Sequence, residues 1–302
     1  MLPLILQPMK LKFLPILILI LNTDETFAQN FDWQGHRGCR GLLPENTVPA
    51  FLKALEFPQV MTLEMDLAVS KNGELIVSHE PWMNEATCTK PDGQPVTKDE
   101  AMSLKIMDMT YEEIKRYDCG SRGNARFSQQ VPMAVHKPSL EDVVAAVRQY
   151  CAANKRPMPR FNIEIKSHPD GDGIFTPKVE DFVKLVMAEI TRLKIAELSC
   201  IQSFDVRALQ VLRKISPDQV MALLVENKDG FEKNLQLLGF QPNIYSVDFH
   251  LLRKRDVKAL HKMGLKVIPW TVNDLKSMKK LRRWNVDGII TDYPNLIAEV
   301  EN

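Results

Sequence analysis

Residues 31–69 read FDWQGHRGCRGLLPENTVPAFLKALEFPQVMTLEMDLAV, and the pattern of this stretch decides the fold. Residues 31–36 predict a strand that ends in a histidine. Residues 47–56 predict a helix, because a threonine can cap its start and a proline is tolerated in its first turn. In residues 62–69 apolar and polar side chains alternate, which is typical of a strand with two different faces. Strand, helix and strand in this order predict a β/α unit of a parallel sheet.

The alternation of strands and helices continues to the end of the chain. Ser139, with an aspartate three residues later, predicts the start of the next helix. Further strands are predicted at 161–165, 198–202, 219–225, 244–247, 266–270 and 288–291. The helices between and after them are predicted at 179–193, 206–215, 230–237, 253–263 and 275–284, with a short C-terminal piece. Eight strand–helix units predict an α/β fold of the (β/α)8 TIM barrel type. An open doubly wound sheet is the alternative, but no Gly-x-Gly-x-x-Gly fingerprint opens any predicted helix.

Residues 81–137 interrupt this alternation of strands and helices. They are rich in Pro, Gly, Lys and Asp and predict only one helix, near 110–117. We expect a small inserted subdomain between the second and third strand–helix units, placed to cap a site. Two of the five cysteines, Cys88 and Cys119, lie in it and form the expected disulfide if the protein is exported. Five reduced thiols are the alternative. Closing this loop would stabilise the fold by about 3.5 kcal/mol on the chain-entropy model.

Residues 1–28 have the layout of a secretory signal peptide. Lys10 and Lys12 precede an apolar run at 13–21, and small residues end the segment at Ala28. The run is shorter than the roughly 20 residues that a membrane span needs. We therefore expect cleavage near Ala28, a mature domain at 29–302 without stable membrane insertion, and a periplasmic or secreted location. An uncleaved anchor and a buried N-terminal helix are the alternatives.

The overall charge carries no electrostatic argument for a nucleic-acid partner. The chain has 39 basic and 38 acidic residues, so its net charge at neutral pH is +1. Any basic site must therefore be local, and a small molecule is the expected ligand. The sequence does not indicate an oligomeric state.

Acidic side chains gather at the predicted carboxyl ends of two strands, where barrel enzymes place reactive groups. Glu64 and Asp66 share one face of the second strand, and Glu164 and Lys166 share one face of the third. Carboxylates this close raise each other's pKa unless a cation neutralises them. Oxygen ligands alone favour Mg²⁺ or Ca²⁺ over Zn²⁺. The alternative is a set of ion pairs with Lys166 and Arg37, although buried ion pairs add little stability.

Two histidines flank these carboxylates. His36 ends the first strand and His79 follows a turn that returns along the second, so they can supply a proton donor and a proton acceptor. Arg37 and Lys166 are suited to bind phosphate oxygens. Trp270, near the end of the seventh strand, offers an apolar wall for a substrate's carbon skeleton or else packs in the core.

This combination points to phosphoryl transfer at a phosphodiester. The chain has no Gly-x-x-x-x-Gly-Lys loop for nucleotides and no Gly-x-Ser-x-Gly nucleophile elbow. A glycosidase also uses paired carboxylates in a barrel, but it has no use for a nearby arginine, lysine and two histidines.

The same residues carry a resemblance to a known family. The segments GHRG, PENT, LEMDLAVSKNGELIVSHE, NIEIKS, PWTVND and DGIITDYP resemble the glycerophosphodiester phosphodiesterase family, in the family's order and over nearly the whole mature chain. The resemblance implies a barrel hydrolase that cleaves glycerophosphodiesters, such as those from deacylated phospholipids, to glycerol 3-phosphate and an alcohol.

The resemblance also implies roles for individual residues. His36 and His79 correspond to the acid–base pair, and one divalent cation, Mg²⁺ or Ca²⁺, is implied. Its ligands would be Glu64, Asp66 and Glu164. The implied substrate contacts are Arg37 and Lys166 on the phosphate, Trp270 as the apolar wall, and Glu45 in support of Arg37 or a helix end.

The chain departs from the family pattern at Glu80, where aspartate usually follows the histidine, and at Cys39. Two other functions stay open. One is a phospholipase of the same barrel type that acts on intact lipids and releases a cyclic phosphate. An apolar rim on the insertion would favour it, yet the insertion is mostly polar apart from Trp82, Met102 and Phe127. The other is a non-catalytic phosphodiester-binding protein, which loss of a catalytic histidine would indicate, and both histidines are present.

Overall fold

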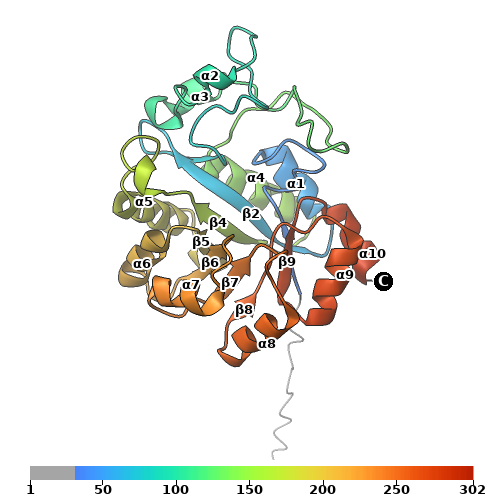
Figure 1. Ribbon diagram of the computed structural model, residues 1–302. Coiled ribbons are helices and arrows are strands. Elements are labelled where there is room, and N and C mark those ends of the chain that lie inside the picture. The colour runs from blue at the N-terminus through green and yellow to red at the C-terminus, as the bar shows by residue number, and fades with distance from the viewer. Residues whose placement is uncertain (1–30, 302) are drawn as a thin grey trace, which may run out of the picture. The chain divides into compact units, whose positions relative to one another are not determined.

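The computed structural model describes residues 31–301, and eight parallel strands in it form a nearly closed barrel (Figure 1). The predicted leader at 1–28 lies outside the described residues. The strands follow one another around the barrel in the order β8-β7-β6-β5-β4-β2-β1-β9. Their bounds are β1 Asp32–Gly35, β2 Val60–Val69, β4 Arg160–Ile165, β5 Ser199–Ser203, β6 Val220–Val225, β7 Ile244–Val247, β8 Lys266–Val267 and β9 Gly288–Thr291. The predicted TIM barrel is confirmed.

Backbone hydrogen bonds between the β8 segment and β9 close the remaining side of the barrel. The Asp287 amide donates to the Val267 carbonyl (2.9 Å) and the Ile290 amide to the Pro269 carbonyl (3.0 Å). The strand predicted at 266–270 ends at Val267, since Pro269 has no N–H to donate to a ladder. The Pro269 carbonyl still accepts a hydrogen bond from Ile290, so the chain continues beside β9 although it is no longer a regular strand.

Helices surround the barrel, each with an apolar face on the strands. Their bounds are α1 Val48–Leu55, α4 Leu140–Ala153, α5 Val179–Arg192, α6 Val206–Ile215, α7 Phe231–Leu238, α8 Lys254–Lys262, α9 Leu275–Trp284 and α10 Ile297–Glu301. The predicted caps are in place. The Thr47 side chain accepts from the Ala50 amide, and Ser139 accepts from the Asp142 amide in a capping box. Within residues 31–301, no helix combines the length and apolar character needed to cross a membrane.

The insertion lies at the end of the barrel toward which the β2 arrow points (Figure 1). It follows β3 (Leu75–Val77), which pairs antiparallel with β2, and it ends where α4 begins. This places it inside the second strand–helix unit, ahead of that unit's helix. It contains α2 (Lys98–Ala101) as well as the predicted helix, α3 (Tyr111–Ile114). The prediction missed α2 because a helix of one turn leaves no periodic pattern in the sequence.

The insertion packs around a second, smaller apolar core, to which β2 contributes Ala68 and β3 contributes Ile76. Cys88 and Cys119 form a disulfide within this core, while Cys39, Cys151 and Cys200 are free thiols. The Arg122 guanidinium also donates to the carbonyls of Glu85 (2.8 Å) and Cys88 (3.0 Å). Covalent and polar links thus hold an irregular segment in one conformation.

Candidate active site

The turn after β1 presents two site residues because two glycines let the chain bend sharply. A Cβ on Gly35 would lie 2.2 Å from the Gly38 carbonyl oxygen, and one on Gly38 would lie 2.6 Å from the Ala50 carbonyl carbon. Arg37, between them, has a φ of 48°, which is uncommon for a residue with a side chain. Its backbone amide donates to Glu64 Oε2 (2.9 Å). The turn is therefore tied directly to the acidic strand β2.

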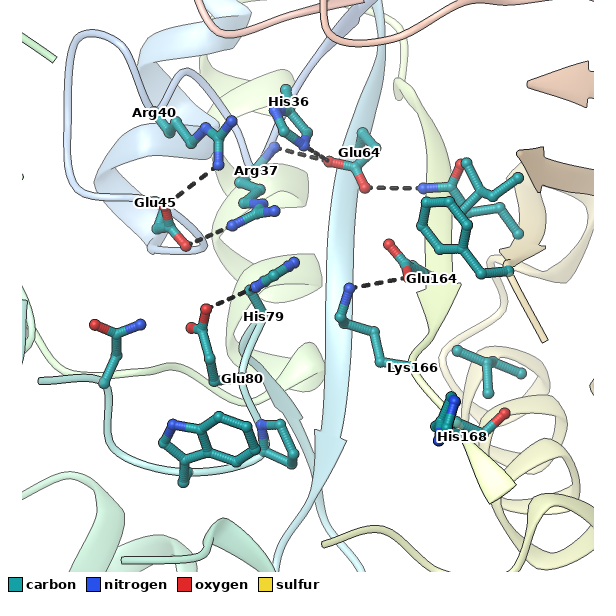
Figure 2. Close-up of a pocket in the computed structure, with 18 of the residues that line it drawn as sticks. His36, Arg37, Arg40, Glu45, Glu64, His79, Glu80, Glu164, Lys166 and His168 are labelled. Atoms are coloured by element: carbon teal, nitrogen blue, oxygen red, sulfur yellow. Dashed lines mark hydrogen bonds and ion pairs between the residues drawn. The ribbon is translucent and has the colours of Figure 1, made fainter. Parts of the chain in front are cut away.

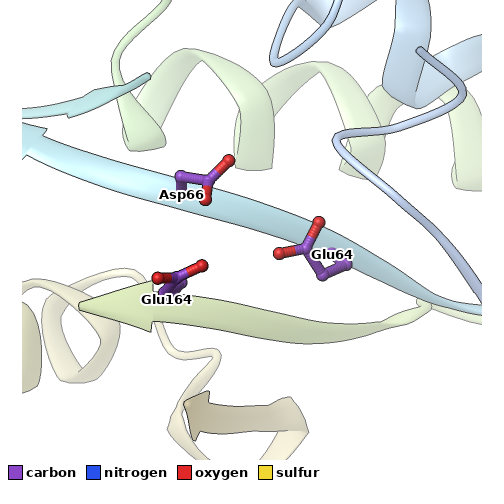
Figure 3. A group of neighbouring side chains, drawn as sticks. All are labelled: Glu64, Asp66 and Glu164. Carbon is purple, nitrogen blue, oxygen red and sulfur yellow. The ribbon is translucent and has the colours of Figure 1, made fainter. Parts of the chain in front are cut away.

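Three buried carboxylates meet beside this turn (Figure 3). Glu64 and Asp66 come from one face of β2, and Glu164 comes from β4, where it is in register with Asp66. One oxygen of each carboxylate lies within 4.8 Å of the others. The side chains that the sequence predicted to converge are thus brought together.

Burial and mutual repulsion shift the pKa values of the three carboxyl groups in different directions. Burial, and then the neighbouring Asp66 charge, raise the pKa of Glu64 well above its ordinary value. Burial is also the main cause that raises the pKa of Glu164. For Asp66 burial acts in the same direction, but Arg37 and Lys166 outweigh it and hold the pKa well below its ordinary value. Burial and repulsion thus oppose the ionisation of Glu64 and Glu164, while Arg37 and Lys166 keep Asp66 ionised.

Two cationic side chains reach the cluster. Arg37 places Nε 3.1 Å from Asp66 Oδ2 and Nη1 2.8 Å from Glu45 Oε1, which is the supporting contact expected of Glu45. Lys166 Nζ lies 3.0 Å from Glu164 Oε1 and 3.5 Å from Asp66 Oδ1. The ion pairs considered from the sequence are thus present.

These ion pairs do not complete the cluster. Among the described residues, Asp66 Oδ1 has no hydrogen-bond partner although it is buried. No lysine or arginine side chain in residues 31–301 pairs with Glu64, which accepts only from the Arg37 amide and from Gln202 Nε2 (2.8 Å). Three carboxylates, one of them with a buried oxygen that accepts no hydrogen bond, fit a divalent cation of the Mg²⁺ or Ca²⁺ type.

His36 is held by a carboxylate that the sequence reasoning did not assign. Its Nδ1 lies 2.6 Å from Asp292 Oδ1, which also accepts from Arg40 Nε (2.7 Å). Asn273 Nδ2 donates to the other oxygen of Asp292 (2.7 Å). Burial, with a further contribution from Arg40, lowers the pKa of His36 to about 4 despite the nearby carboxylate. Asp292 directly follows β9 at its carboxyl end, so its position in the barrel was the available signal.

His79 has a similar arrangement on the other side of the site. Its Nδ1 lies 2.8 Å from Glu80 Oε1, so the glutamate in place of the family's aspartate still reaches the ring. Burial opposes the ionisation of Glu80, but the hydrogen bond from His79 lowers its pKa to about 2. Lys137, the last residue of the insertion, donates to Ser78 Oγ (2.8 Å), which donates to the Glu80 carbonyl (2.6 Å). The sequence reasoning missed Lys137, because a lysine in an irregular segment leaves no pattern.

These groups open onto one cavity of about 810 Å³ at the carboxyl ends of the strands (Figure 2). The predicted residues that line it are His36, Arg37, Glu45, Glu64, His79, Glu164, Lys166 and Trp270. Asp66 is almost fully buried at 1% exposure and does not line the cavity, but it contacts Arg37 and Lys166, which do. Trp270 donates through Nε1 to the Ser246 carbonyl (3.0 Å) and packs edge-on against Phe204.

A sequence model of the glycerophosphoryl diester phosphodiesterase family matches residues 36–296, a span that includes every residue of the site. The chain belongs to this family. A glycerophosphodiester phosphodiesterase of Bacillus altitudinis is 30% identical over 270 residues, which cover 88% of this chain and 96% of that protein. The family and the enzyme class that the sequence predicted, a phosphodiester hydrolase, are confirmed.

Solved structures agree with this family membership. A structure from Silicibacter pomeroyi, assigned to the glycerophosphoryl diester phosphodiesterases, has a TM-score of 0.78 at 26% identity and covers 89% of this chain and 92% of that one. A phosphodiesterase of Oleispira antarctica, solved with the product sn-glycerol-3-phosphate, has a TM-score of 0.69 at 20% identity. That match covers 89% of this chain and 96% of that chain, and it shows the shared fold.

Proposed function

We propose that this phosphodiesterase hydrolyses glycerophosphodiesters to glycerol 3-phosphate and an alcohol. The observation that carries the proposal is that two histidines, Arg37, Lys166 and two carboxylates of the acidic cluster, Glu64 and Glu164, line a single cavity (Figure 2). Asp66, the third carboxylate of the cluster, is buried beside them. Each histidine binds a carboxylate through Nδ1, so proton transfer falls to Nε2. His36 Nε2 lies 3.8 Å from Glu64 Oε2, which places it beside the acidic cluster.

The two histidines take different roles in this proposal. Asp292 can only accept, so it takes the proton of His36 Nδ1, and the low pKa of His36 keeps Nε2 unprotonated at neutral pH. We assign His36 as the general base and His79 as the general acid. His36 takes the proton of the glycerol hydroxyl next to the ester, and that oxygen attacks phosphorus. The bond from phosphorus to the leaving alcohol breaks as His79 protonates the alcohol oxygen, and water then opens the cyclic phosphate with the proton transfers reversed.

The remaining residues bind and orient the substrate. Arg37 and Lys166 contact the phosphate oxygens, and Glu45 keeps the Arg37 guanidinium in place. Trp270 covers the carbon skeleton of the glycerol. Glu64, Asp66 and Glu164 would hold a divalent cation, which supplies Lewis-acid stabilisation of charge on phosphate oxygens when bound.

Product analysis tests this proposal against its alternatives. The purified chain from residue 29, supplied with glycerophosphocholine and Mg²⁺ or Ca²⁺, should release glycerol 3-phosphate and choline. Phosphorus NMR monitors the conversion of the diester to glycerol 3-phosphate. A cyclic phosphate that persists as the final product would indicate the phospholipase-type reaction instead. Binding of the diester without turnover would indicate the non-catalytic alternative.

The low pKa of His36 predicts the pH dependence of the reaction. A general base must be neutral, and His36 is neutral above its pKa of about 4. We therefore expect kcat/KM to stay high below the ordinary histidine pKa of about 6.5 and to fall only as the pH falls toward 4. The measurement is kcat/KM against pH in buffers that do not bind the cation. A fall centred near the ordinary value would contradict the assignment of His36 as the buried base.

We also propose that the protein is exported. The layout of residues 1–28 supports this, and so does the disulfide, because disulfides persist mainly in oxidising compartments. N-terminal sequencing of the chain from producing cells should begin near Gln29, and a chain that still carries the residues before Ala28 would contradict export with cleavage.

A further inference from the structure

We propose that Asn162 and Gln202 are positioning residues, which fix the orientation of the Glu64 carboxylate through a chain of buried amides inside the barrel. This rests on the proposed function, in which Glu64 is one of three residues that would hold the cation. Gln34 is the third amide of the chain. We name Gln34, Asn162 and Gln202 together the amide relay.

The interior of the barrel has a polar half and an apolar half. The interior of a TIM barrel is usually filled by bulky apolar side chains. Here one buried apolar cluster comes from β6, β7, β9 and the segment after β8, and contains Ala222, Ile244, Ile268 and Ile290. Strands β1, β2, β4 and β5 instead contribute buried polar side chains, which are Gln34, Glu64, Asn162 and Gln202. Burial of this many polar groups costs free energy unless they are hydrogen-bonded to one another.

The amide relay runs without a break from Asp32, at the amino end of β1, to Glu64. Gln34 Nε2 donates to Asp32 Oδ2 (2.9 Å). Asn162 Nδ2 donates to Gln34 Oε1 (2.8 Å) and also to Gln202 Oε1 (3.0 Å). Gln202 Nε2 donates to Glu64 Oε1 (2.8 Å). All three relay residues are between 1% and 3% exposed, so water does not compete for these hydrogen bonds.

An ion pair anchors the amino end of the relay. Asp32 accepts from Thr62 Oγ1 (2.6 Å) and pairs with Arg160 Nη2 (2.9 Å). A carboxylate in an ion pair can only accept hydrogen bonds, so Gln34 must turn its NH₂ group toward Asp32. The oxygen of Gln34 therefore faces Asn162, which has to donate to it.

The relay passes this orientation on to Glu64. One nitrogen, Asn162 Nδ2, makes both of the Asn162 donations, so the oxygens of Gln34 and Gln202 both face it. Gln202 is then left with its NH₂ group toward Glu64. A rotated Gln202 would place two acceptors together at Glu64 and two donors together at Asn162. The other oxygen of Glu64 accepts from the Arg37 amide (2.9 Å), so one N–H group holds each oxygen of this carboxylate.

Asn162 keeps this orientation at the expense of its own oxygen. Asn162 Oδ1 is buried and has no hydrogen-bond partner among the described residues. An unpaired buried acceptor destabilises the folded state, and an apolar side chain of similar shape would avoid this penalty. The relay therefore favours the orientation of Glu64 over the stability of the fold.

Glu64 depends on the relay more than the other two carboxylates do. Asp66 and Glu164 each contact a cationic side chain, whereas in residues 31–301 no lysine or arginine side chain pairs with Glu64. Hydrogen-bonded partners that orient a metal ligand typically contribute 10–100-fold to metal affinity. We therefore expect loss of the relay to weaken cation binding even though no ligand is removed.

The experiment is a calorimetric titration of the purified chain with Mg²⁺ or Ca²⁺ in the absence of any diester. Gln202→Met should raise the dissociation constant of the cation about 10–100-fold, because methionine has a similar length but cannot donate to Glu64. Gln202 also lines the catalytic cavity, and the absence of a diester keeps any contact with substrate out of the measurement.

Gln219→Met is the matched control. Gln219 is also a buried glutamine, but it donates to the carbonyls of Ala196 and Ser199, outside the relay. Its variant should lose stability and keep the wild-type dissociation constant. A general loss of packing would therefore be distinguished from a loss of orientation at Glu64.

Asn162→Asp separates orientation from charge. Asn162 is in register with Glu64 on the neighbouring strand, so an added carboxylate would tighten cation binding if charge alone decided the affinity. If the relay orients Glu64, the same variant should weaken binding by at least about tenfold. Aspartate cannot make both donations of Asn162 Nδ2, and Gln202 becomes free to rotate. Gln202→Met introduces no charge and tests the relay even if Asn162→Asp does not fold.

The outcomes separate this inference from the proposed function. An unchanged dissociation constant in Gln202→Met would overturn the inference, and so would tighter binding in Asn162→Asp or a wild-type chain that binds neither cation. Hydrolysis of glycerophosphocholine by the wild type would leave the proposed function intact in each of these cases. Cation binding that weakens in both variants would support the relay even if the wild type hydrolysed no diester.

Discussion

His36→Gln will lower kcat/KM for glycerophosphocholine by about 10²–10⁴-fold, because a general base contributes a factor of this size. Glutamine keeps a polar side chain but cannot take up the proton of the glycerol hydroxyl. Asp292→Asn should cause a loss of similar size through the same histidine, because an amide can donate to Nδ1 and so favours the wrong tautomer. The measurement is steady-state kinetics with the cation at saturation.

His250→Gln is the matched control for this prediction. His250 also places Nδ1 2.8 Å from an aspartate, Asp248, but it lies outside the catalytic cavity and is 71% exposed in its side chain. Its variant should retain wild-type kinetics. If His36→Gln retained them as well, with its fold intact by circular dichroism, the role of His36 as base would be wrong.

Glu164→Gln will change activity and stability in opposite directions. Loss of one of three oxygen ligands should weaken the cation's effect on turnover by at least about 100-fold, since even indirect supporting contacts contribute 10–100-fold at metal sites. In the presence of a chelator, the same variant should unfold at a higher temperature. Burial raises the pKa of Glu164, which means that its ionised form destabilises the folded state at neutral pH. We expect a gain on the order of 1 kcal/mol, or about 2 °C.

Calorimetric melting with chelator and with added cation tests both halves of this prediction. The cation should raise the melting temperature of the wild type and should have a much smaller effect on the variant. Glu141→Gln, at an exposed glutamate on α4 that pairs with Arg192, is the control and should behave as the wild type. A chelated variant that melts below the chelated wild type would show that the Glu164–Lys166 ion pair outweighs the repulsion in the cluster.

The sequence predicted the barrel and most of the site because both depend on strand periodicity. Glu64 and Asp66 are two residues apart on a strand, so their shared face follows from backbone geometry, and Glu164 follows from the register of the next strand. The (β/α)8 topology then places the ends of these strands together. Local patterns also predicted the caps at Thr47 and Ser139.

The contacts that tune the histidines could not be predicted in this way. Asp292 reaches His36 across 256 positions of sequence, and only closure of the barrel between its last and first strands brings them together. Lys137 reaches the segment of His79 through an insertion without periodic structure. The edge-on contact between Trp82 and Phe175 has the same origin, because it joins two loops that have no repeating pattern. Such pairings depend on tertiary structure alone.

Activity before and after removal and return of the cation tests the proposed metal-dependent hydrolysis. The purified chain should release glycerol 3-phosphate from glycerophosphocholine, lose this activity after exhaustive chelation, and regain it on addition of Mg²⁺ or Ca²⁺. Glu164→Gln measured in parallel should show little recovery. Glycerol 3-phosphate released at an unchanged rate after chelation would contradict the assignment of the three carboxylates to a catalytic cation, and no release with either cation would contradict the proposed reaction itself.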